Sequence, residues 1–546
     1  MTPSTASHAL LRVLADAGID RAFLVPGESY LGVLDALHDF PQIDVVTCRH
    51  EAGAGFMAIA DGRLTGRPGV VMASRGPGAS NAAIAIHAAQ QDAVPLIVIV
   101  GQVPKRDLRR EAFQEIDYQK MYGSIAKWVF EATQPEQLPE AAFKAVRIAT
   151  SGTPGPVVLV LPEDVQQQAV ATREWSAPSP RPTLPDPATL GQLEAMLRRA
   201  QRPLLIPGGA FERPGGREAL LAFAEAWSLP VVVSFRRNDA FPNRHRLYAG
   251  ELGLANPDAQ LAAFRRSDLV LALGTRFGDI TSQGYTLLDL PRPNQPFVHC
   301  YPDEHVVGLH FVPDLPLVCD PLALLGALTP DWMELHPAER ETWRLELRAL
   351  YEARAAWPER SPVDGVDFAR VVRSVYEQAT EDLVVCVDAG TFAAPVYRHF
   401  AFQPPQRLMA PICGAMGYGV PAAVATQLRY PGRRVVCMAG DGGFMMTGNE
   451  AMLAVERRLP ILFIVSNNAS YASIRIHQER DYPGRTVGTA LFNPDFVGLA
   501  QAFGMPARRV SSADEIDAAV REGLAGSGPC LLEVATSLQA VLPGRA

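Results

Sequence analysis

The sequence predicts an α/β fold built of three doubly wound parallel-sheet domains, and three observations lead to this prediction. The chain has 546 residues, which at roughly 150 residues per domain corresponds to three or four domains. Short runs of Val, Ile and Leu alternate throughout with longer Ala-rich helical stretches, a pattern typical of parallel sheets covered by helices on both faces. Two segments rich in Pro and polar residues interrupt this alternation.

The buried strands are expected at the short apolar runs, because a parallel strand is covered on both faces. The expected strands are 45–47, 69–73, 96–100 and 157–161 in the first third, 204–206, 231–233 and 269–273 in the second, and 384–387, 435–438 and 461–465 in the last.

The two interrupting segments set the expected domain limits. Residues 176–188 read SAPSPRPTLPDPA, and residues 357–365 read WPERSPVDG after a charged helix expected over 339–354. Segments of this composition are extended and exposed. The predicted domains are therefore 1–172, 188–345 and 362–540.

Composition excludes several classes of partner. Lys and Arg total 50 against 58 for Asp and Glu, a net charge of −8, so no broad basic face is available for nucleic acid or for an anionic membrane. The longest apolar run, residues 93–100, is far shorter than the roughly 20 residues of a membrane helix. We expect neither nucleic acid nor membrane as a partner.

The N-terminal residues and the cysteines indicate a cytoplasmic enzyme. Residues 1–9 have neither a basic segment nor an apolar signal core. The seven cysteines show no CxxC spacing, which favours reduced, mostly buried thiols.

The segment 434–468 carries the most specific chemistry. A strand reading VVCMAG leads directly into Asp441, a helix is expected over 447–457, and a second strand ends at Asn467 and Asn468. Ligands bind at the carboxyl ends of strands in doubly wound sheets. Gly442 and Gly443 allow close backbone approach, and their amides with a helix N-terminus favour an anion such as diphosphate.

Asp441 and Asn468 provide oxygen ligands of the kind that Mg²⁺ takes together with phosphate oxygens and water. The alternative is an ordinary turn at GDG and a helix cap at the two asparagines. The occurrence of both motifs at this spacing favours a metal-bound diphosphate.

With these motifs the chain resembles thiamine-diphosphate enzymes of the pyruvate oxidase and acetohydroxyacid synthase superfamily, and among them the acetolactate synthase large subunit. The resemblance covers nearly the whole chain. Its motifs are VPGESYLGVLDAL (25–37), RHEAGAGFMA (49–58), GPGASN (76–81), DAVPLIVIVGQVP (92–104), EAFQE (111–115), GAMGYGVPAA (414–423), GDGGF and NNASY. It implies a pyrimidine-binding first domain, a nucleotide-binding-like central domain and a diphosphate-binding third domain.

The resemblance also implies residue roles. Asp441, Asn468 and the main-chain carbonyl of Ser470 hold Mg²⁺. Glu51 exchanges a proton with the aminopyrimidine ring of the cofactor, a general acid-base role; the alternative is an ordinary ion pair with Arg49 or Arg63.

Further cofactor contacts follow from the family pattern. Met416 is the apolar residue beneath the bent cofactor, with core packing as the alternative, and the carbonyl of Gly414 accepts from the exocyclic amine. Gly390 and Thr391 match the diphosphate loop loosely, because acetolactate synthases carry Gln-His after that glycine. The remaining implied contacts are Pro26, Asn81, Gly442, Gly443 and Tyr471.

By resemblance the cofactor lies between the first domain of one subunit and the third domain of another, which implies a homodimer or homotetramer. The expected reaction decarboxylates a 2-oxo acid such as pyruvate and joins the product to a second carbonyl. Gln114 is expected to donate to a developing oxyanion; the alternative is a surface amide on a loop.

Three departures from the synthase pattern keep other outcomes open. The position of a tryptophan in biosynthetic synthases is His477 here, either an acid-base or acceptor-binding group or an exposed histidine without a chemical role. Glu28 stands where synthases carry a small residue; it either protonates the intermediate towards an aldehyde or is only a favourable charge at a helix N-terminus.

The third departure concerns FAD, which synthases bind in the central domain. Residues 204–216 and 271–279 resemble the nucleotide segments, whereas HCYPDEH (299–305) replaces the usual Asp pattern. FAD binding and a vestigial scaffold both stay open. The alternative functions are a 2-oxo acid decarboxylase, a C–C lyase acting on 2-hydroxyketones or diketones, and a cofactor-binding homologue without turnover.

Overall fold

The computed structural model describes residues 4–171, 182–329 and 338–542. Residues 176–181 of the first interrupting segment lie outside the described residues, as do residues 1–3 and 172 of the first predicted domain and 330–337 of the second. The predicted limits 1–172, 188–345 and 362–540 each enclose one six-stranded sheet.

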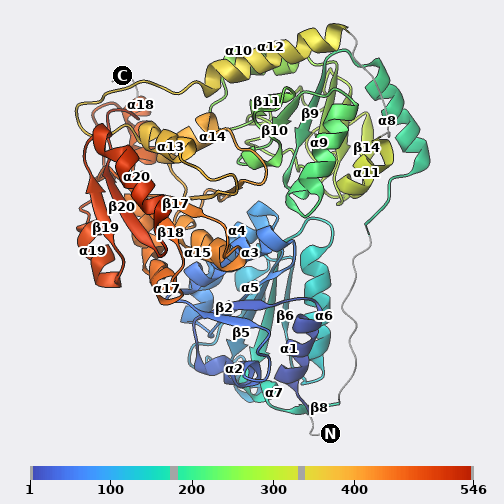
Figure 1. The fold of residues 1–546 in the computed structure, drawn as a ribbon. Helices are drawn as coiled ribbons and strands as arrows, with labels where there is room; N and C mark the ends of the chain where they lie inside the picture. Colours follow the sequence, from blue (N-terminus) through green and yellow to red (C-terminus); the bar gives the residue numbers. More distant parts are fainter. Residues whose placement is uncertain (1–3, 172–181, 330–337, 543–546) are drawn as a thin grey trace. The chain divides into compact units, whose positions relative to one another are not determined.

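Three six-stranded parallel sheets confirm the predicted fold class (Figure 1). In the first sheet the strand order is β3 (Asp44–Thr47), β2 (Arg21–Leu24), β4 (Gly69–Ala73), β5 (Leu96–Gln102), β7 (Pro156–Pro162) and β6 (Trp128–Glu131). Two short strands, β1 (Ser4–Thr5) and β8 (Ala169–Val170), pair antiparallel beside it. The strands expected at 45–47, 69–73, 96–100 and 157–161 are therefore present, with ends that differ by up to two residues.

Helices cover both faces of the first sheet. Helices α1 (Ala6–Asp16), α2 (Leu31–Leu37) and α6 (Gln137–Thr150) share one apolar core with alternate residues of the strands. Helices α3 (Glu51–Thr65) and α4 (Pro77–Asp92) pack against each other and against the strands. A Cβ on Gly55 of α3 would lie 2.2 Å from the Cβ of Ala85 of α4, so glycine permits the close approach of these helices.

The second sheet has the order β11 (Tyr248–Glu251), β10 (Val231–Val233), β9 (Pro203–Pro207), β12 (Leu269–Leu273), β13 (Phe297–Cys300) and β14 (Leu315–Leu317). One face packs on α8 (Pro187–Arg199), α9 (Gly216–Ala226) and α11 (Pro321–Leu328). The other packs on α10 (Asp258–Arg265) and α12 (Ala338–Ala355). Helix α12 corresponds to the charged helix expected over 339–354.

The third sheet has the order β16 (Arg407–Met409), β15 (Val384–Val387), β17 (Val435–Gly440), β18 (Ile461–Asn467), β20 (Cys530–Ala535) and β19 (Ala507–Val510). Its helices include α13 (Phe368–Glu377), α14 (Ala394–His399), α15 (Gly419–Arg429), α18 (Ala472–Asp481), α19 (Phe496–Phe503) and α20 (Ile516–Ala525). All three expected strands of this third of the chain are present.

The prediction of a helix over 447–457 is wrong about the residue at which the helix begins. Helix α16 begins at Asp441 itself and runs to Thr447, followed by a 3₁₀ turn, η6 (Gly448–Glu450), and α17 (Ala451–Glu456). The glycines of the GDGG motif therefore form the first helical turn, because the strand ends with Gly440 in an extended conformation (φ −75°, ψ 156°) that serves as the N-cap.

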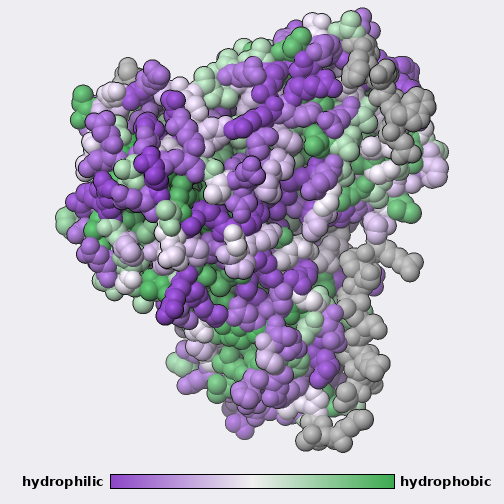
Figure 2. All heavy atoms as spheres, viewed as in Figure 1, coloured by the Kyte–Doolittle hydropathy of each residue, from purple (hydrophilic) through white to green (hydrophobic). Residues whose placement is uncertain are grey.

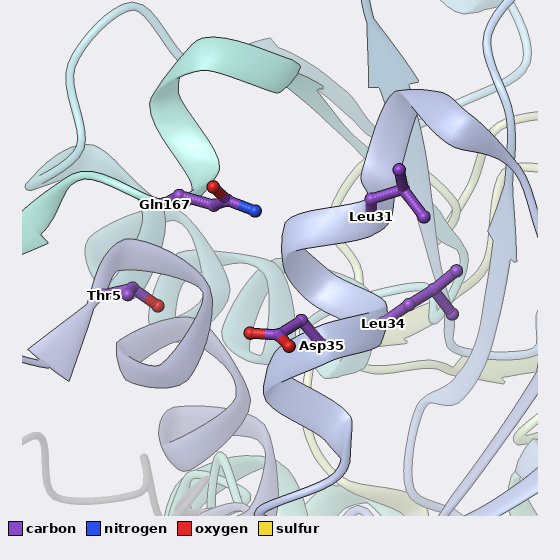
Figure 3. Close-up of a pocket in the computed structure, with 5 residues that line it drawn as sticks. All are labelled: Thr5, Leu31, Leu34, Asp35 and Gln167. Atoms are coloured by element: carbon purple, nitrogen blue, oxygen red, sulfur yellow. The ribbon is translucent and has the colours of Figure 1, made fainter.

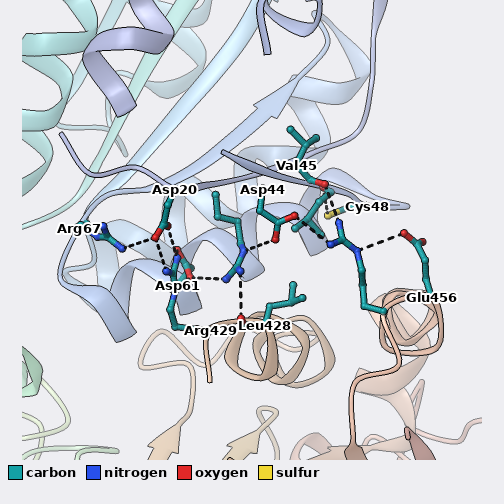
Figure 4. A network of polar contacts seen from close by, with 12 residues as sticks. Asp20, Asp44, Val45, Cys48, Asp61, Arg67, Leu428, Arg429 and Glu456 are labelled. Atoms are coloured by element: carbon teal, nitrogen blue, oxygen red, sulfur yellow. Dashed lines mark hydrogen bonds and ion pairs between the residues drawn. The ribbon is translucent and has the colours of Figure 1, made fainter. Parts of the chain in front are cut away.

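The chain forms two compact units, one containing 1–180, 386–391 and 409–546, and the other 181–385 and 392–408. Most of the third domain thus shares a unit with the first. An ion-pair network joins α15 to the first domain (Figure 4). Arg429 donates to Asp20 at 2.9 and 2.8 Å and to both oxygens of Asp61 at 2.8 Å. Bidentate pairs of this kind add geometric specificity to a contact.

All seven cysteines are free thiols and five are buried, in agreement with the expectation from their spacing. Hydrophilic side chains cover most of the face in Figure 2. Among the described residues no helix has the length and apolarity required to span a bilayer.

Candidate active site

The Asp441 carboxyl group lies buried at the carboxyl end of β17. Strand β17 pairs in parallel with β18, and Gly440 stands opposite Ser466, so Asp441 and the two asparagines emerge at the same edge of the sheet. The Asp441 side chain accepts hydrogen bonds from the Gly442 amide at 2.9 Å and from Asn493 Nδ2 at 2.8 Å. Burial raises the pKa of Asp441, and these donors oppose the shift.

Asn468, Ser470 and Tyr471 form the turn that faces Asp441. Asn468 Oδ1 accepts from the Ser470 amide at 3.1 Å, and the Ala469 and Ser470 amides interact with the Asp441 carboxyl group. A Cβ on Gly442 would lie 2.4 Å from the Tyr471 ring. Glycine is therefore needed at position 442 because the Tyr471 ring approaches it, a reason that differs from the expected approach of a ligand.

Asn493 is a contact that sequence reasoning missed. Its Nδ2 group also donates to Asn467 Oδ1 at 2.9 Å, and Asn467 Nδ2 donates to Glu533 at 2.8 Å. Asn493 thereby fixes one oxygen of the Asp441 carboxyl group. No short spacing relates Asn493 to the GDG or NN motifs, since folding alone brings it there.

The glycine loop that carries Gly414 and Met416 is tied to the same edge. The Gly417 amide donates to both carboxylate oxygens of Asp388, at 2.9 and 3.0 Å, and the Thr447 hydroxyl donates to the Gly417 carbonyl at 2.6 Å. Asp388 is the second residue that sequence reasoning missed. Gly414 has φ +74° and open space where a side chain would begin, and Met416 is half-buried.

Gly390 and Thr391 follow Asp388 and lie beside the start of α18. The Thr391 amide donates to Ser473 Oγ at 3.0 Å. The structure therefore brings the predicted residues of the third domain together around Asp441, Asp388 and the loop of Met416.

Glu51 occupies the first position of α3 and is 7% exposed. Its Oε2 accepts from Asn81 Nδ2 at 2.9 Å, and its Oε1 approaches Gly78 so closely that a Cβ there would lie 2.9 Å away. The alternative interpretation, an ion pair with Arg49 or Arg63, is not what the structure has: the Arg49 guanidinium pairs with Glu456 at 3.1 Å, and Arg63 donates to the Ala410 carbonyl.

Gln114 and the Glu28 loop lie against the same N-terminus of α4. A Cβ on Gly76 would be 2.7 Å from the Gln114 Cβ, and Gln114 itself is half-buried with φ +65°. Gly27 packs against Ser74 just before α4, and the Ser29 hydroxyl accepts from the Arg75 amide at 2.9 Å. Glu28 and Pro26 are exposed beside these contacts.

Glu450 is the third residue that sequence reasoning missed. It is fully buried at the end of η6, and its Oε1 accepts from the Arg49 and His50 amides at 3.0 and 2.9 Å. The pKa of Glu450 is raised to about 7: burial raises it most, the two amides lower it, and the negative charge of Glu51 raises it.

His477 lies on the exposed face of α18, where its Nδ1 contacts Arg480 Nη2 at 3.0 Å. None of the other predicted site residues contacts it through a hydrogen bond within the part of the chain that the structure describes. Its chemical role stays a prediction.

A surface pocket on the first domain is separate from these residues (Figure 3). It is lined by Thr5, Leu31, Leu34, Asp35 and Gln167, none of which was predicted to act on substrate or cofactor. The pocket lies on the α1 and α2 side of the first sheet, whereas Glu51 heads α3.

The glycine turn of the central domain differs from the expected nucleotide turn. The Gly208 amide donates to the Leu273 carbonyl at 2.9 Å and the Ala210 amide donates to the Gly274 carbonyl at 3.2 Å. Helix α9 begins only at Gly216. The amides of Gly208 and Ala210 are thus occupied by main-chain carbonyls, so these two groups do not fit a flavin diphosphate.

Comparison with protein families identifies each of the three domains. The thiamine pyrophosphate enzyme N-terminal TPP binding domain matches residues 4–121, the central domain matches 190–328 and the C-terminal TPP binding domain matches 388–534. These ranges contain Glu51 and Gln114 in the first match and Asp441 and Asn468 in the last.

Similar proteins span nearly the whole chain. The acetolactate synthase large subunit of Corynebacterium glutamicum is 31% identical over 531 residues, covering 95% of this chain and 84% of that protein. The acetolactate synthase isozyme 2 large subunit of Escherichia coli is 30% identical over 528 residues, covering 96% and 94%. The probable acetolactate synthase large subunit of Methanocaldococcus jannaschii is 29% identical over 555 residues, covering 98% and 93%.

Proposed function

Because this chain belongs to the thiamine pyrophosphate enzyme family, we propose that it decarboxylates a 2-oxo acid such as pyruvate and ligates the resulting two-carbon unit to a second carbonyl compound, with thiamine diphosphate and Mg²⁺. The observation that carries the proposal is the buried Asp441 carboxyl group at the sheet edge, surrounded by oxygen and amide groups, in the same chain as a buried Glu51. When bound, the cofactor supplies the carbon nucleophile and accepts the electrons released on decarboxylation.

The donor set at Asp441 fits Mg²⁺ and diphosphate. A carboxylate, the amide oxygen of Asn468 and the main-chain carbonyl of Ser470 are hard oxygen donors, and Mg²⁺ completes its octahedron with phosphate oxygens and water. The positive charge of Mg²⁺ would also stabilise the ionised form of Asp441, and so oppose the effect of burial, which raises the pKa of this carboxyl group. The N-terminus of α16 adds a favourable field for the anion.

Glu51 is suited to hold and move a proton at the aminopyrimidine ring. Its carboxyl group is shielded from water, and Asn81 fixes one oxygen by donating at 2.9 Å, which leaves the other oxygen for the cofactor. A proton donor or acceptor held in place in this manner is what general acid-base catalysis requires.

Distances along the helices support a site shared between two copies of the chain. The Ala410 carbonyl is bound by Arg63 and the Ile412 and Cys413 amides by Asp92, which places the segment just before Gly414 at the C-terminal ends of α3 and α4. Glu51 lies at the other end of α3, about 18 Å from Arg63 at 1.5 Å per residue. Glu51 therefore suits a cofactor held by another copy.

Exposed apolar side chains also support a homo-oligomer. Met445 and Met446 of α16 are 51% and 49% exposed and Ile474 of α18 is 56% exposed. Apolar surface of this extent next to a proposed site is typical of an interface. Either a homodimer or a homotetramer would cover these exposed apolar side chains.

Gln114 and Glu28 are proposed to face the substrate, because Gln114 lies against the α4 N-terminus that also contacts Glu51, and the neighbours of Glu28 contact the residues just before that helix. Gln114 would donate to the oxygen that gains charge. Glu28 would favour protonation of the intermediate and release of an aldehyde instead of ligation. A decarboxylase or lyase is therefore the second candidate function.

Product analysis tests the proposal. Purified protein with pyruvate, thiamine diphosphate and Mg²⁺ should form acetolactate, with about one CO₂ released for every two pyruvates, because the cofactor carries one decarboxylated unit to the second carbonyl. Acetaldehyde with one CO₂ per pyruvate would favour the second candidate. Absence of any ligated product across a series of 2-oxo acids would contradict the carboligase assignment. Flavin absorption of the purified protein would distinguish FAD binding from a vestigial central domain.

A further inference from the structure

Glu450 makes a contact that bridges the diphosphate-binding and pyrimidine-binding domains at the catalytic residue. Its Oε1 accepts from two consecutive amides, those of Arg49 and His50, at 3.0 and 2.9 Å. These two residues immediately precede Glu51, so the carboxylate holds the main chain from which the Glu51 side chain extends. Helix α3 begins at Glu51, and the entry direction of the chain into the helix is fixed at this point.

The surroundings of Glu450 leave it little freedom to move. The side chain is 0% exposed, and a Cβ on Gly53 would lie 2.6 Å from its Oε1, so glycine at position 53 is what admits the carboxyl group. Within the described residues, Glu450 Oε2 is buried and has no hydrogen-bond partner. A buried oxygen without a hydrogen-bond partner lowers the stability of the folded state. The presence of the Glu450 carboxyl group at this position therefore indicates a role other than stability.

We propose that Glu450 is a positioning residue that fixes the main chain of Arg49 and His50 and thereby sets the orientation of the Glu51 carboxyl group towards the cofactor. The inference rests on the proposed function, since it assigns Glu450 to the same active site. Glu450 does not touch the reacting atoms; it acts through Glu51.

Replacement of Glu450 is expected to change turnover and not the affinity for substrate or cofactor. A displacement of about 1 Å in a catalytic group lowers the rate by about 100-fold. Asp441, by contrast, lies nine residues earlier at the start of α16, and its contacts do not involve Glu450. Loss of the Glu450 contact should therefore lower kcat while the KM for the 2-oxo acid and the Kd for thiamine diphosphate stay within about threefold.

The test compares four variants of the full-length protein. Glu450→Ala removes both accepted hydrogen bonds and should lower kcat by about 30- to 100-fold. Glu450→Gln keeps an oxygen acceptor of the same shape and should stay within about fivefold of the wild type. Gly53→Ala keeps the Glu450 side chain but forces it to move, because the added Cβ would lie 2.6 Å from its Oε1. The kcat of this variant should therefore resemble that of Glu450→Ala.

Glu456→Ala is the matched control. Glu456 lies on the adjacent helix α17 and contacts the same Arg49, but through the guanidinium and at an exposed position. Exposed pairs contribute about 0–1 kcal/mol, so kcat should be unchanged. Hydrogen exchange of the Arg49 and His50 amides should become at least about tenfold faster in Glu450→Ala, and stay at the wild-type rate in Glu450→Gln and Glu456→Ala.

Two results would overturn the inference. The first is wild-type kcat in Glu450→Ala, and the second is unchanged amide exchange at Arg49 and His50 in that variant. Failure of the proposed function appears differently, as a wild-type protein that turns over no 2-oxo acid; the exchange comparison then still decides whether Glu450 holds this segment.

Discussion

Glu51→Gln is expected to lower kcat by about 1,000-fold, within the range of general acid-base contributions, while thiamine diphosphate stays bound. The amide side chain keeps the shape and can still meet Asn81, which donates to Glu51 at 2.9 Å, but it can no longer carry a proton to and from the aminopyrimidine ring. Steady-state kinetics together with cofactor titration by fluorescence quenching measures both quantities.

The matched control for this variant is Glu140→Gln. Glu140 is an exposed glutamate of α6 that pairs with Lys144, so its replacement should leave kcat unchanged. A Glu51→Gln variant with wild-type turnover would remove Glu51 from the mechanism. A wild-type protein that binds the cofactor but shows no turnover with any 2-oxo acid would instead favour the non-catalytic homologue.

Asp441→Ala is expected to weaken thiamine diphosphate binding by about 150- to 4,000-fold, equivalent to the roughly 3–5 kcal/mol lost when one partner of a buried charge pair is removed. Mg²⁺ would lose its carboxylate, and the diphosphate would face amides and a helix N-terminus alone. Isothermal titration with Mg²⁺ present measures the change directly.

The Tm of the Asp441 variants distinguishes loss of the binding site from loss of the fold. Burial raises the pKa of Asp441, so without a cation the ionised carboxylate destabilises the folded state at pH values above its ordinary pKa. Asp441→Asn removes that charge and should leave the Tm of the cofactor-free protein equal or higher. Asp514→Ala, at an exposed residue of η7 (Ala513–Glu515), should change neither Tm nor affinity. Tight binding by Asp441→Ala would contradict the metal assignment.

The ten expected strands are all present, because each is a short apolar run in a parallel sheet. The sequence analysis missed the other strands of the three sheets, which are β2, β6, β11, β13, β14, β16, β19 and β20. Strands β4, β10, β12 and β15 have the expected ends, and others such as β5 and β18 extend by two residues, where Gln102 and Asn467 continue the ladder despite being polar. The start of helix α16 was predicted wrongly because glycines favour turns in isolation, whereas here an extended Gly440 serves as the helix N-cap.

The site residues were predictable where a motif carries them and not where tertiary structure supplies them. Glu51 and Asp441 stand in motifs, and the structure buries both. The missed residues Asn493 and Glu450 lie 52 residues from Asp441 and 400 residues from His50, the residues that they contact. No spacing rule connects such pairs, since the fold alone brings them together.

Mixing the two inactive variants tests most directly whether Glu51 of one chain and Asp441 of another serve the same cofactor. Equal amounts of Glu51→Gln and Asp441→Ala, dissociated and reassembled, should regain about a quarter of wild-type activity per chain, because half of the random dimers carry one intact shared site of two. Activity that stays at the level of the separate variants, with mixed dimers present by native mass spectrometry, would contradict a site built from two chains.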